Sequence, residues 1–171
     1  NIQRGTEEMV SAMQYIENTV FVIIGGGDVL GNLKRQVSEM GLNDKVLFIS
    51  RMPFSQLYRY TVHADIAVTL DKDTNINYRF SLPNKLFDYI QARVPVLASD
   101  LVEIRKVVEG YGIGRIIPTH EPVEIAAAVN DMLSDSIQYE KWKENLSFAA
   151  EALCWEKEEE KLTRIFSGLA G

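Results

Sequence analysis

Short, wholly apolar segments alternate along this chain with longer segments in which apolar residues recur at helical spacing. Residues 6–16 illustrate the second kind, because Met9, Val10 and Met13 fall on one helical face. Residues 20–24 illustrate the first kind, since every position is apolar and most are β-branched. Such a run is typical of a strand that is covered on both faces.

The same alternation continues to the end of the chain. We expect further strands at residues 45–49, 65–70, 94–98 and 112–117, and further helices at 29–40, 54–63, 82–92, 101–109, 122–134, 136–153 and 155–169. A long polar loop is expected at residues 71–80. This order predicts an α/β fold: a doubly wound parallel sheet with helices on both faces, and a helical C-terminal tail. Because such a sheet normally opens with a strand, we expect its first strand to lie outside these residues.

Composition narrows the possible partners. The 171 residues, 46% of them hydrophobic and 25% charged, are typical of one globular domain covering residues 1–171. The formal net charge of −6 argues against a nucleic-acid partner, which would require a basic face. Cys154 is the only cysteine, and His63 and His120 are far apart, so neither a disulfide framework nor a metal cluster is indicated. No apolar run approaches the ~20 residues of a membrane span, and the start lacks a signal peptide's layout, so we expect a cytoplasmic location.

A glycine-rich turn is the first candidate ligand site. Gly25, Gly26 and Gly27 follow the first apolar strand and precede a helix. In a parallel α/β sheet, ligands sit beyond the carboxyl ends of the strands, where glycines let the backbone approach a phosphate closely. The spacing is not that of a dinucleotide-binding fingerprint, because Leu30 stands where the third glycine would be. The alternative is that these glycines only form a tight turn.

The second candidate site is the start of the helix expected at residues 82–92. Ser81 is placed to cap this helix, whose unpaired N–H groups and positive dipole end would face the carboxyl edge of the sheet. Lys85 in the first turn adds a point charge for a phosphate. Asp88 falls on the same face, where its carboxylate can accept two hydroxyl hydrogen bonds from a ribose. The alternative is an exposed Lys85–Asp88 surface pair of little energetic value.

Two further features carry weaker signals. Asp71-Lys72-Asp73 places two carboxylates at a strand end, where they can hold a divalent metal ion that bridges a diphosphate. A solvated loop is the alternative for this short pattern. Arg4 precedes the first helix, where a guanidinium can bind a phosphate through two hydrogen bonds.

Taken in order, these segments resemble the donor-binding C-terminal domain of the GT-B glycosyltransferases, in particular the large retaining family 4 (group 1). The resemblance spans essentially the whole chain. Arg4 occupies the place of the basic residue in a K-G-x-x-x-L-I-x-A opening, which contacts the donor diphosphate. Residues 21–27 are similar to L-x-I-x-G-x-G. Residues 46–52 are similar to V-x-F-x-G-x-V, whose final loop, here with Arg51 and Met52, faces the nucleotide base in relatives.

The most specific similarity lies in residues 82–99. They resemble a P-x-K-x-F-E-Y-x-A-x-G-x-P-V-x-A-S variant, common in enzymes that build bacterial surface polysaccharides. Asp88 takes the place of the second glutamate of the family's E-x7-E motif, which holds the donor ribose. Arg93 replaces the usual glycine. The first glutamate would fall at Phe80, which cannot perform its role, although several subgroups of the family lack it.

The resemblance implies a retaining glycosyltransferase that binds a nucleoside-diphosphate sugar without a metal ion or other cofactor. No catalytic residue is assigned. The residues implied at the donor are Arg4, Gly25, Gly26, Gly27, Arg51, Met52, Ser81, Leu82, Pro83, Asn84, Lys85 and Asp88. The acceptor site would lie on a separate N-terminal domain, through which any peripheral membrane contact would also be made. This chain alone is therefore expected to bind the donor without turning it over.

Three alternatives stay open. The chain can be half of a sugar-nucleotide epimerase, since those enzymes share this architecture. It can be a non-catalytic interaction module of a polysaccharide assembly complex, for which Phe80 at the first motif position is the best support. It can also belong to a metal-dependent transferase through Asp71 and Asp73, in which case donor binding would depend on manganese.

Overall fold

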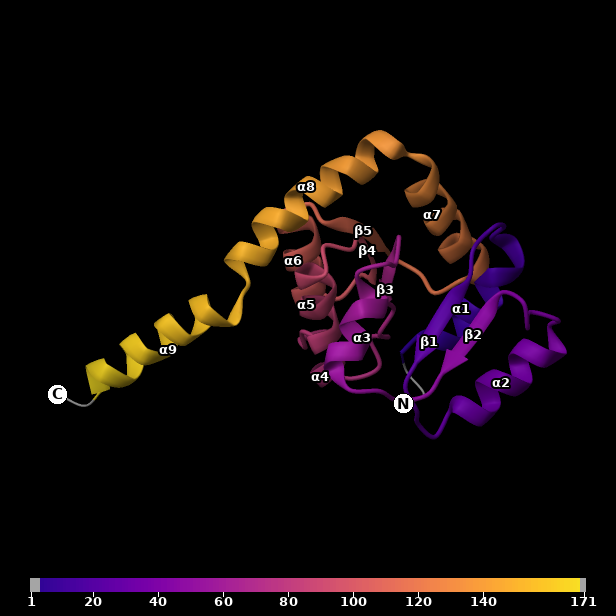
Figure 1. Cartoon of the computed structure of the whole chain (residues 1–171), viewed down its shortest axis with the longest axis horizontal. Helices are drawn as coiled ribbons and strands as arrows, with labels where there is room; N and C mark the ends of the chain where they lie inside the picture. Colours follow the sequence, from indigo (N-terminus) through magenta and orange to yellow (C-terminus); the bar gives the residue numbers. More distant parts are fainter. Residues whose placement is uncertain (1–3, 170–171) are drawn as a thin grey trace.

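The computed structural model describes residues 4–169 and confirms the predicted alternation of strands and helices (Figure 1). The strands are β1 (Phe21–Ile24), β2 (Val46–Ile49), β3 (Ala67–Thr69), β4 (Val96–Ser99) and β5 (Gly114–Ile117). The helices are α1 (Thr6–Ala12), the short 3-10 helix η1 (Met13–Tyr15), α2 (Leu30–Glu39), α3 (Phe54–Thr61), α4 (Ile76–Arg79), α5 (Asn84–Gln91), α6 (Val102–Tyr111), α7 (Pro122–Ser134), α8 (Ser136–Ala152) and α9 (Trp155–Leu169).

The segment predicted as a long loop contains the short helix α4. Its N-cap is Asn75, whose side-chain oxygen accepts a hydrogen bond from the backbone N–H of Tyr78 (3.0 Å). An asparagine at this position satisfies one of the N–H groups that a helix start leaves unpaired. A capping residue in an otherwise polar stretch therefore formed a helical turn that hydrophobic periodicity did not reveal.

The predicted cap of α5 is wrong. Ser81 donates its hydroxyl hydrogen bond back to the carbonyl of Tyr78 (3.3 Å), and α5 begins only at Asn84, with Pro83 as its N-cap. A residue that precedes proline is disfavoured in the helical region, so Leu82 cannot start the helix. The start of α5 consequently lacks a side-chain cap.

Every strand pair is parallel, as predicted. β1 pairs with β2, with Phe21 opposite Val46. β4 lies between β3 and β5, with Val96 opposite both Ala67 and Gly114. Within the described residues the strands form two hydrogen-bonded groups, β1–β2 and β3–β4–β5. Helices flank both groups: α2 lies beside β1–β2, and α5 and α6 lie beside β3–β4–β5 (Figure 1).

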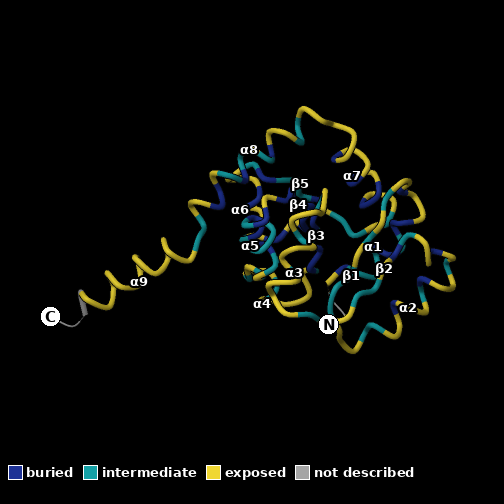
Figure 2. Tube along the Cα trace, in the orientation of Figure 1, coloured by how far each residue is buried: buried dark blue, intermediate teal, exposed yellow. Residues whose placement is uncertain are grey.

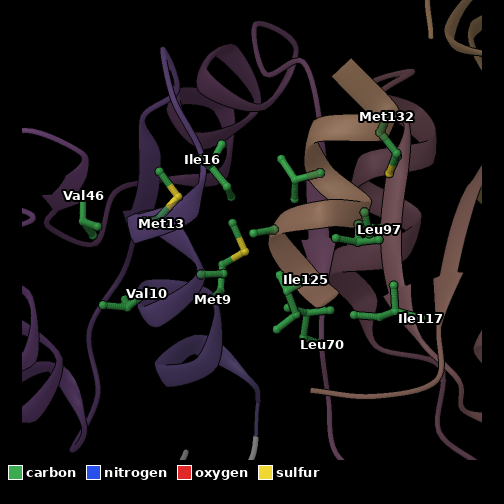
Figure 3. Packing of buried hydrophobic residues seen from close by; sticks show 14 of the residues in the cluster. Met9, Val10, Met13, Ile16, Val46, Leu70, Leu97, Ile117, Ile125 and Met132 are labelled. Atoms are coloured by element: carbon green, nitrogen blue, oxygen red, sulfur yellow. The ribbon is translucent and has the colours of Figure 1, made fainter. Parts of the chain in front are cut away.

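One hydrophobic cluster holds the two groups of strands together. Figure 3 shows side chains of α1 and η1, such as Met9 and Met13, meeting those of α7, such as Ile125. The same cluster takes in residues from both groups of strands, namely Val46, Leu70, Leu97 and Ile117, with Phe21, Ile23 and Val68 packed against it. α1 and α7 therefore bridge strands that do not pair with each other.

The two groups of strands differ in how well they are covered. β4 is buried at each of its four positions. On β1, Phe21 and Ile23 pack against the cluster, whereas Val22 is 41% exposed, and Leu47 beside it on β2 is 50% exposed. The expectation that residues 20–24 are covered on both faces is therefore wrong for the described chain, because its helices cover only the face that carries Phe21 and Ile23.

The last helix stands apart from the rest. α9 extends away from the body of the molecule (Figure 1) and is exposed over residues 155–167 (Figure 2). Its apolar residues Trp155, Ile165 and Phe166 are all exposed. Over residues 4–169, no helix combines the length and the apolar character needed to cross a membrane.

Candidate functional site

Gly5 fixes the start of α1 against the end of β3. Its φ of +65° lies in the left-handed region that glycine adopts readily. A Cβ atom at this position would lie 2.3 Å from the carbonyl oxygen of Leu70, so no side chain fits. This close approach brings Arg4 beside Asp71, the residue that follows Leu70. Two segments that are distant in sequence thus meet at the carboxyl end of β3.

Asp71 is the centre of a charged group that we call the Asp71 cluster: Arg4, Thr69, Asp71 and Lys85. The Asp71 side chain is only 5% exposed. Its Oδ2 accepts a hydrogen bond from Thr69 Oγ1 (3.2 Å) and lies 3.2 Å from Lys85 Nζ. Its Oδ1 lies 3.8 Å from Arg4 Nε and accepts no hydrogen bond within the described residues. One carboxylate therefore faces two cations, which leaves an excess of positive charge.

Lys85 lies in the first turn of α5, as predicted, but its ammonium pairs with Asp71 and not with Asp88. Burial lowers the pKa of Lys85; Asp71 opposes this shift, and Arg4 adds to it. Because α5 has no side-chain cap, its first backbone N–H groups are left beside the ammonium. A cation next to the positive end of a helix dipole is an arrangement that binds anions such as phosphate.

Asp88 lies three residues after Lys85, and therefore on the same face of α5. Its side chain makes no hydrogen bond or ion pair with another described residue, and burial raises its pKa. The next residue, Tyr89, anchors the helix on β3, since its hydroxyl donates to the carbonyl of Val68 (3.4 Å). Burial raises the pKa of Tyr89 to about 12, so this hydroxyl stays protonated at neutral pH. The result is a fixed helix that presents an unpaired carboxylate one turn from a cation.

The glycine turn and the loop after β2 are open at the surface. Gly25 and Gly27 have φ values of +134° and +158°, and no atom lies within 4 Å of a Cβ built on Gly25, Gly26 or Gly27. Arg51 is exposed and Met52 is half-buried, both directly after β2. In the part of the chain that is described, no hydrogen bond or ion pair joins these residues to the Asp71 cluster. Their role in ligand binding stays a prediction, and it requires a ligand that extends from the Asp71 cluster to the glycine turn and the loop after β2.

The remaining predicted residues border the start of α5. Leu82 and Asn84 are exposed and Pro83 is half-buried. Phe80, which stands at the position of the family's first glutamate, ends α4 and is 52% exposed. Arg93, at the position of the family's glycine, has a φ of +56°. The backbone there takes the conformation for which glycine is the natural residue.

The sequence Asp71-Lys72-Asp73 does not form a shared carboxylate site. Lys72 pairs with Glu8 of α1, and Asp73 accepts two hydrogen bonds of 3.0 Å from Nε of Arg79. Asp71 and Asp73 are therefore paired with different cations. Over residues 4–169, no group of three or more histidine, cysteine or acidic side chains could hold a metal ion. The donor set of the metal-dependent alternative is not assembled here.

Sequence reasoning missed two features of this region. One is the central place of Asp71, and the other is a contact of His120, whose Nε2 lies 3.0 Å from both Ser99 Oγ and the carbonyl of Leu70. Because a carbonyl oxygen only accepts, Nε2 carries a hydrogen atom in this arrangement. The contact ties the end of β4 to the segments that follow β3 and β5. No local sequence pattern predicts this contact, because these residues are far apart in sequence.

A surface depression elsewhere on the molecule is not part of this site. It is lined by residues of β5, α7 and α8, among them Arg115, Asp131 and Trp142. Arg115 and Asp131 form an ion pair of 2.8 Å across it. None of the residues predicted to bind the donor lines this depression.

Comparison with known proteins relates the chain to sugar-transferring enzymes. Residues 2–147 match the family described as "Glycosyl transferases group 1". A probable glycosyltransferase of Pseudomonas aeruginosa, WbjE, is 25% identical over 134 residues, which are 75% of this chain and 32% of that protein. The chain therefore spans about a third of the length of this curated relative.

Solved structures share the fold at lower sequence identity. Sucrose-phosphate synthase from Thermosynechococcus elongatus has a TM-score of 0.85 and 21% identity, over 99% of this chain and 43% of that one. Anabaena Alr3699/HepE in complex with UDP and glucose has a TM-score of 0.83 and 15% identity, over 98% of this chain and 45% of that one. Both likenesses establish the architecture, and in both this chain corresponds to less than half of the other protein.

Proposed function

Because the chain belongs to the glycosyl transferases group 1 family, we propose that it is the donor-binding domain of a retaining glycosyltransferase. The enzyme would move a sugar from a nucleoside-diphosphate sugar to a glycan or lipid-linked acceptor. One observation carries the proposal: Arg4 and Lys85 meet on a single buried carboxylate beside the uncapped start of α5. This excess of positive charge suits a diphosphate.

The proposed chemistry is electrostatic. When the bond between the sugar and the diphosphate breaks, negative charge grows on the leaving phosphate. Arg4, Lys85 and the first N–H groups of α5 are placed to stabilise that charge, and preorganised groups of this kind act most strongly in the transition state. Asp88 would accept hydrogen bonds from the two ribose hydroxyls, and Gly25 to Gly27 would let the backbone approach the donor. No metal ion is needed in this scheme.

We further propose that the complete protein adds a strand between the two groups of strands. β1 and β3 each have an edge that pairs with no described strand. Gly5 lies against Leu70 at the carboxyl end of β3, and α1 then runs back over the shared core. A parallel strand that leads into Gly5 would form the usual strand–helix–strand unit with α1 and β1.

The acceptor site, and any membrane contact, would lie on an N-terminal domain that completes the active cleft. On this proposal the chain alone binds the donor but does not turn it over. The complete enzyme would act in the cytoplasm, where nucleoside-diphosphate sugars are used. The configuration of the new glycosidic bond, read by NMR of the product made by the complete enzyme, tests the retaining assignment.

The first experiment is a calorimetric titration of UDP, GDP and ADP into this chain at pH 7.5, with and without magnesium. UDP is tried first because a solved neighbour was crystallised with it. The matched variants are Asp88→Asn, which removes the ribose acceptor charge, and Asp44→Asn, an exposed aspartate just before β2. We expect one diphosphate to bind without metal, Asp88→Asn to weaken binding about tenfold, and Asp44→Asn to leave it unchanged.

Failure of the titration has a definite meaning. If none of the three diphosphates binds this chain or a longer protein that includes the acceptor domain, the donor-domain proposal is wrong and the interaction module becomes the better account. Binding that requires manganese would favour a metal-dependent transferase. Binding that ignores Asp88→Asn would remove that residue from the site.

A further inference from the structure

Asp71 is an acidic residue at the centre of the proposed diphosphate site. A carboxylate repels the phosphates that Arg4 and Lys85 are proposed to attract. Yet Asp71 is almost fully buried, and its Oδ2 lies against both Thr69 Oγ1 and Lys85 Nζ. Within the described residues, its hydrogen bonding to neutral groups amounts to the Thr69 hydroxyl alone. Its carboxylate is therefore directed mainly at the two cations.

The position of Asp71 is itself rigid. It follows Leu70, whose carbonyl is held by the His120 ring and is in close contact with Gly5. Lys85 and Arg4, in contrast, have long side chains that lose rotamer freedom when they are held in one place. A fixed carboxylate between two flexible cations can set the place that both occupy before a ligand arrives.

We propose that Asp71 is the positioning residue of the diphosphate site: it holds Arg4 and Lys85 on one anchored carboxylate and maintains the charge of the buried ammonium. This inference rests on the proposed function, since the diphosphate is the ligand that the two cations would meet. Burial lowers the pKa of Lys85, and Asp71 is the group that opposes the loss of its proton. Without Asp71, burial and the nearby guanidinium would act on Lys85 unopposed.

The charged surroundings of Lys85 define what else could influence it. Arg4, from the segment before α1, and Asp71, from the segment after β3, are the groups that shift its pKa. Among the described residues, Asp88 and Tyr89 lie on the helix itself, Tyr58 of α3 donates its hydroxyl to the carbonyl of Gln91 at the far end of α5, and Lys143 of α8 donates to the carbonyl of Arg93 just beyond that end. Asp71 is therefore the anion that pairs with this ammonium.

The test is the pH dependence of UDP affinity in Asp71→Asn, measured by calorimetry from about pH 6 to about pH 9. The ammonium form binds the diphosphate, so affinity is present below the pKa of Lys85 and is lost as the pH rises through it. Near pH 6 both proteins keep the ammonium, so the variant loses the positioning of the two cations and also the repelling carboxylate; these changes oppose each other, and the two affinities are similar. Near pH 9 the variant binds more weakly than the wild type, because its lysine loses the proton at lower pH; each unit of difference between the two Lys85 pKa values changes the affinity by up to about tenfold. The two affinity curves therefore diverge as the pH rises.

Two further variants separate this role from simple damage. Asp73→Asn removes the same charge two residues away, where it pairs with Arg79, and should leave the pH profile unchanged. Asp71→Asn combined with Lys85→Arg should regain binding near pH 9, because a guanidinium does not lose its charge in this range. A structural defect in Asp71→Asn would instead weaken binding by the same factor at every pH, and the arginine would not restore it.

A ligand-free measurement completes the test. In protein labelled with 13C at the lysine side chains, the Lys85 resonance, assigned through Lys85→Arg, should titrate at lower pH in Asp71→Asn than in the wild type. An unchanged Lys85 titration, or parallel affinity curves, would overturn the inference. If the Lys85 titration shifts but UDP does not bind the wild type, the proposed function fails, and with it the assignment of Asp71 to a diphosphate site.

Discussion

The two groups of strands differ more than their similar lengths suggest. β3–β4–β5 encloses a strand that is buried at every position, and the Asp71 cluster forms at its carboxyl edge. β1–β2 leaves Val22 and Leu47 exposed and ends in a glycine turn with no side chain near it. The enclosed group therefore carries the paired charges, whereas no side chain lies against the glycine turn of the open group. If the chain binds a donor as proposed, β3–β4–β5 would supply most of the charge and β1–β2 would supply room for the ligand.

The largest expected effect on stability comes from comparing one glycine beside each group of strands. Gly5→Ala would place a methyl group 2.3 Å from the Leu70 carbonyl, at a φ that disfavours alanine. We expect a loss of about 4 kcal/mol in the free energy of unfolding, the range of a buried clash combined with backbone strain. Gly26→Ala, where no atom lies within 4 Å, should change it by less than about 0.5 kcal/mol.

Urea denaturation of the two glycine variants measures both values. Similar losses in the two would mean that the glycine turn of the open group is as constrained as the contact at the end of β3. A stable Gly5→Ala variant would show that α1 can shift away from β3, and Arg4 would then have no fixed place beside Asp71.

The next effect compares one leucine from each group of strands. Leu97 of β4 is fully buried and belongs to the cluster between α7 and the strands, whereas Leu47 of β2 is half exposed. We expect Leu97→Ala to lower the free energy of unfolding by about 3 kcal/mol, because it removes buried contacts and leaves a cavity. Leu47→Ala should lower it by less than about 1 kcal/mol, since little contact is lost.

Measuring the same two leucine variants in the complete protein makes this comparison of the two groups of strands more specific. If a further segment of the complete protein covers the open face of β1–β2, Leu47→Ala should become more destabilising there than in this chain. An equally small effect in both proteins would mean that the face carrying Val22 and Leu47 stays open to solvent.

The sequence predicted those parts of the molecule that depend on local periodicity or on a family motif. Residues 6–16 and 20–24 were placed on a helix and a strand because apolar spacing decides both. Lys85 was placed in the first turn of α5 by its motif. For Asp71 the sequence offers a metal pair or a solvated loop, and neither interpretation places it beside Arg4 and Lys85, which come from two other segments. That contact depends on how closely α1 approaches β3, which no local pattern reports.

The misplaced cap of α5 shows a second limit. Ser81 is a good capping residue by type, and a serine before an apolar helix usually does cap it. The Leu82–Pro83 pair delays the helix, and the serine hydroxyl turns back to Tyr78 instead. The missing cap is what leaves the first N–H groups of α5 available beside Lys85. The capping rule therefore fails at the helix start where the candidate site requires unpaired backbone N–H groups.

The smallest effect tests whether the enclosed group of strands is strained where α5 turns into β4. Arg93 has a φ of +56° and is exposed, so its side chain contributes little packing to offset the left-handed backbone. Its carbonyl accepts a hydrogen bond from Lys143 (2.8 Å), which any residue at this position can keep. Arg93→Gly should therefore raise the free energy of unfolding by about 0.5–1 kcal/mol, after subtraction of the entropy that glycine gains in the unfolded chain.

Arg93→Ala, which loses the same side chain but keeps the Cβ atom, serves as the control in urea denaturation. A gain in both variants would assign the effect to the arginine side chain, and a gain in glycine alone would assign it to the backbone.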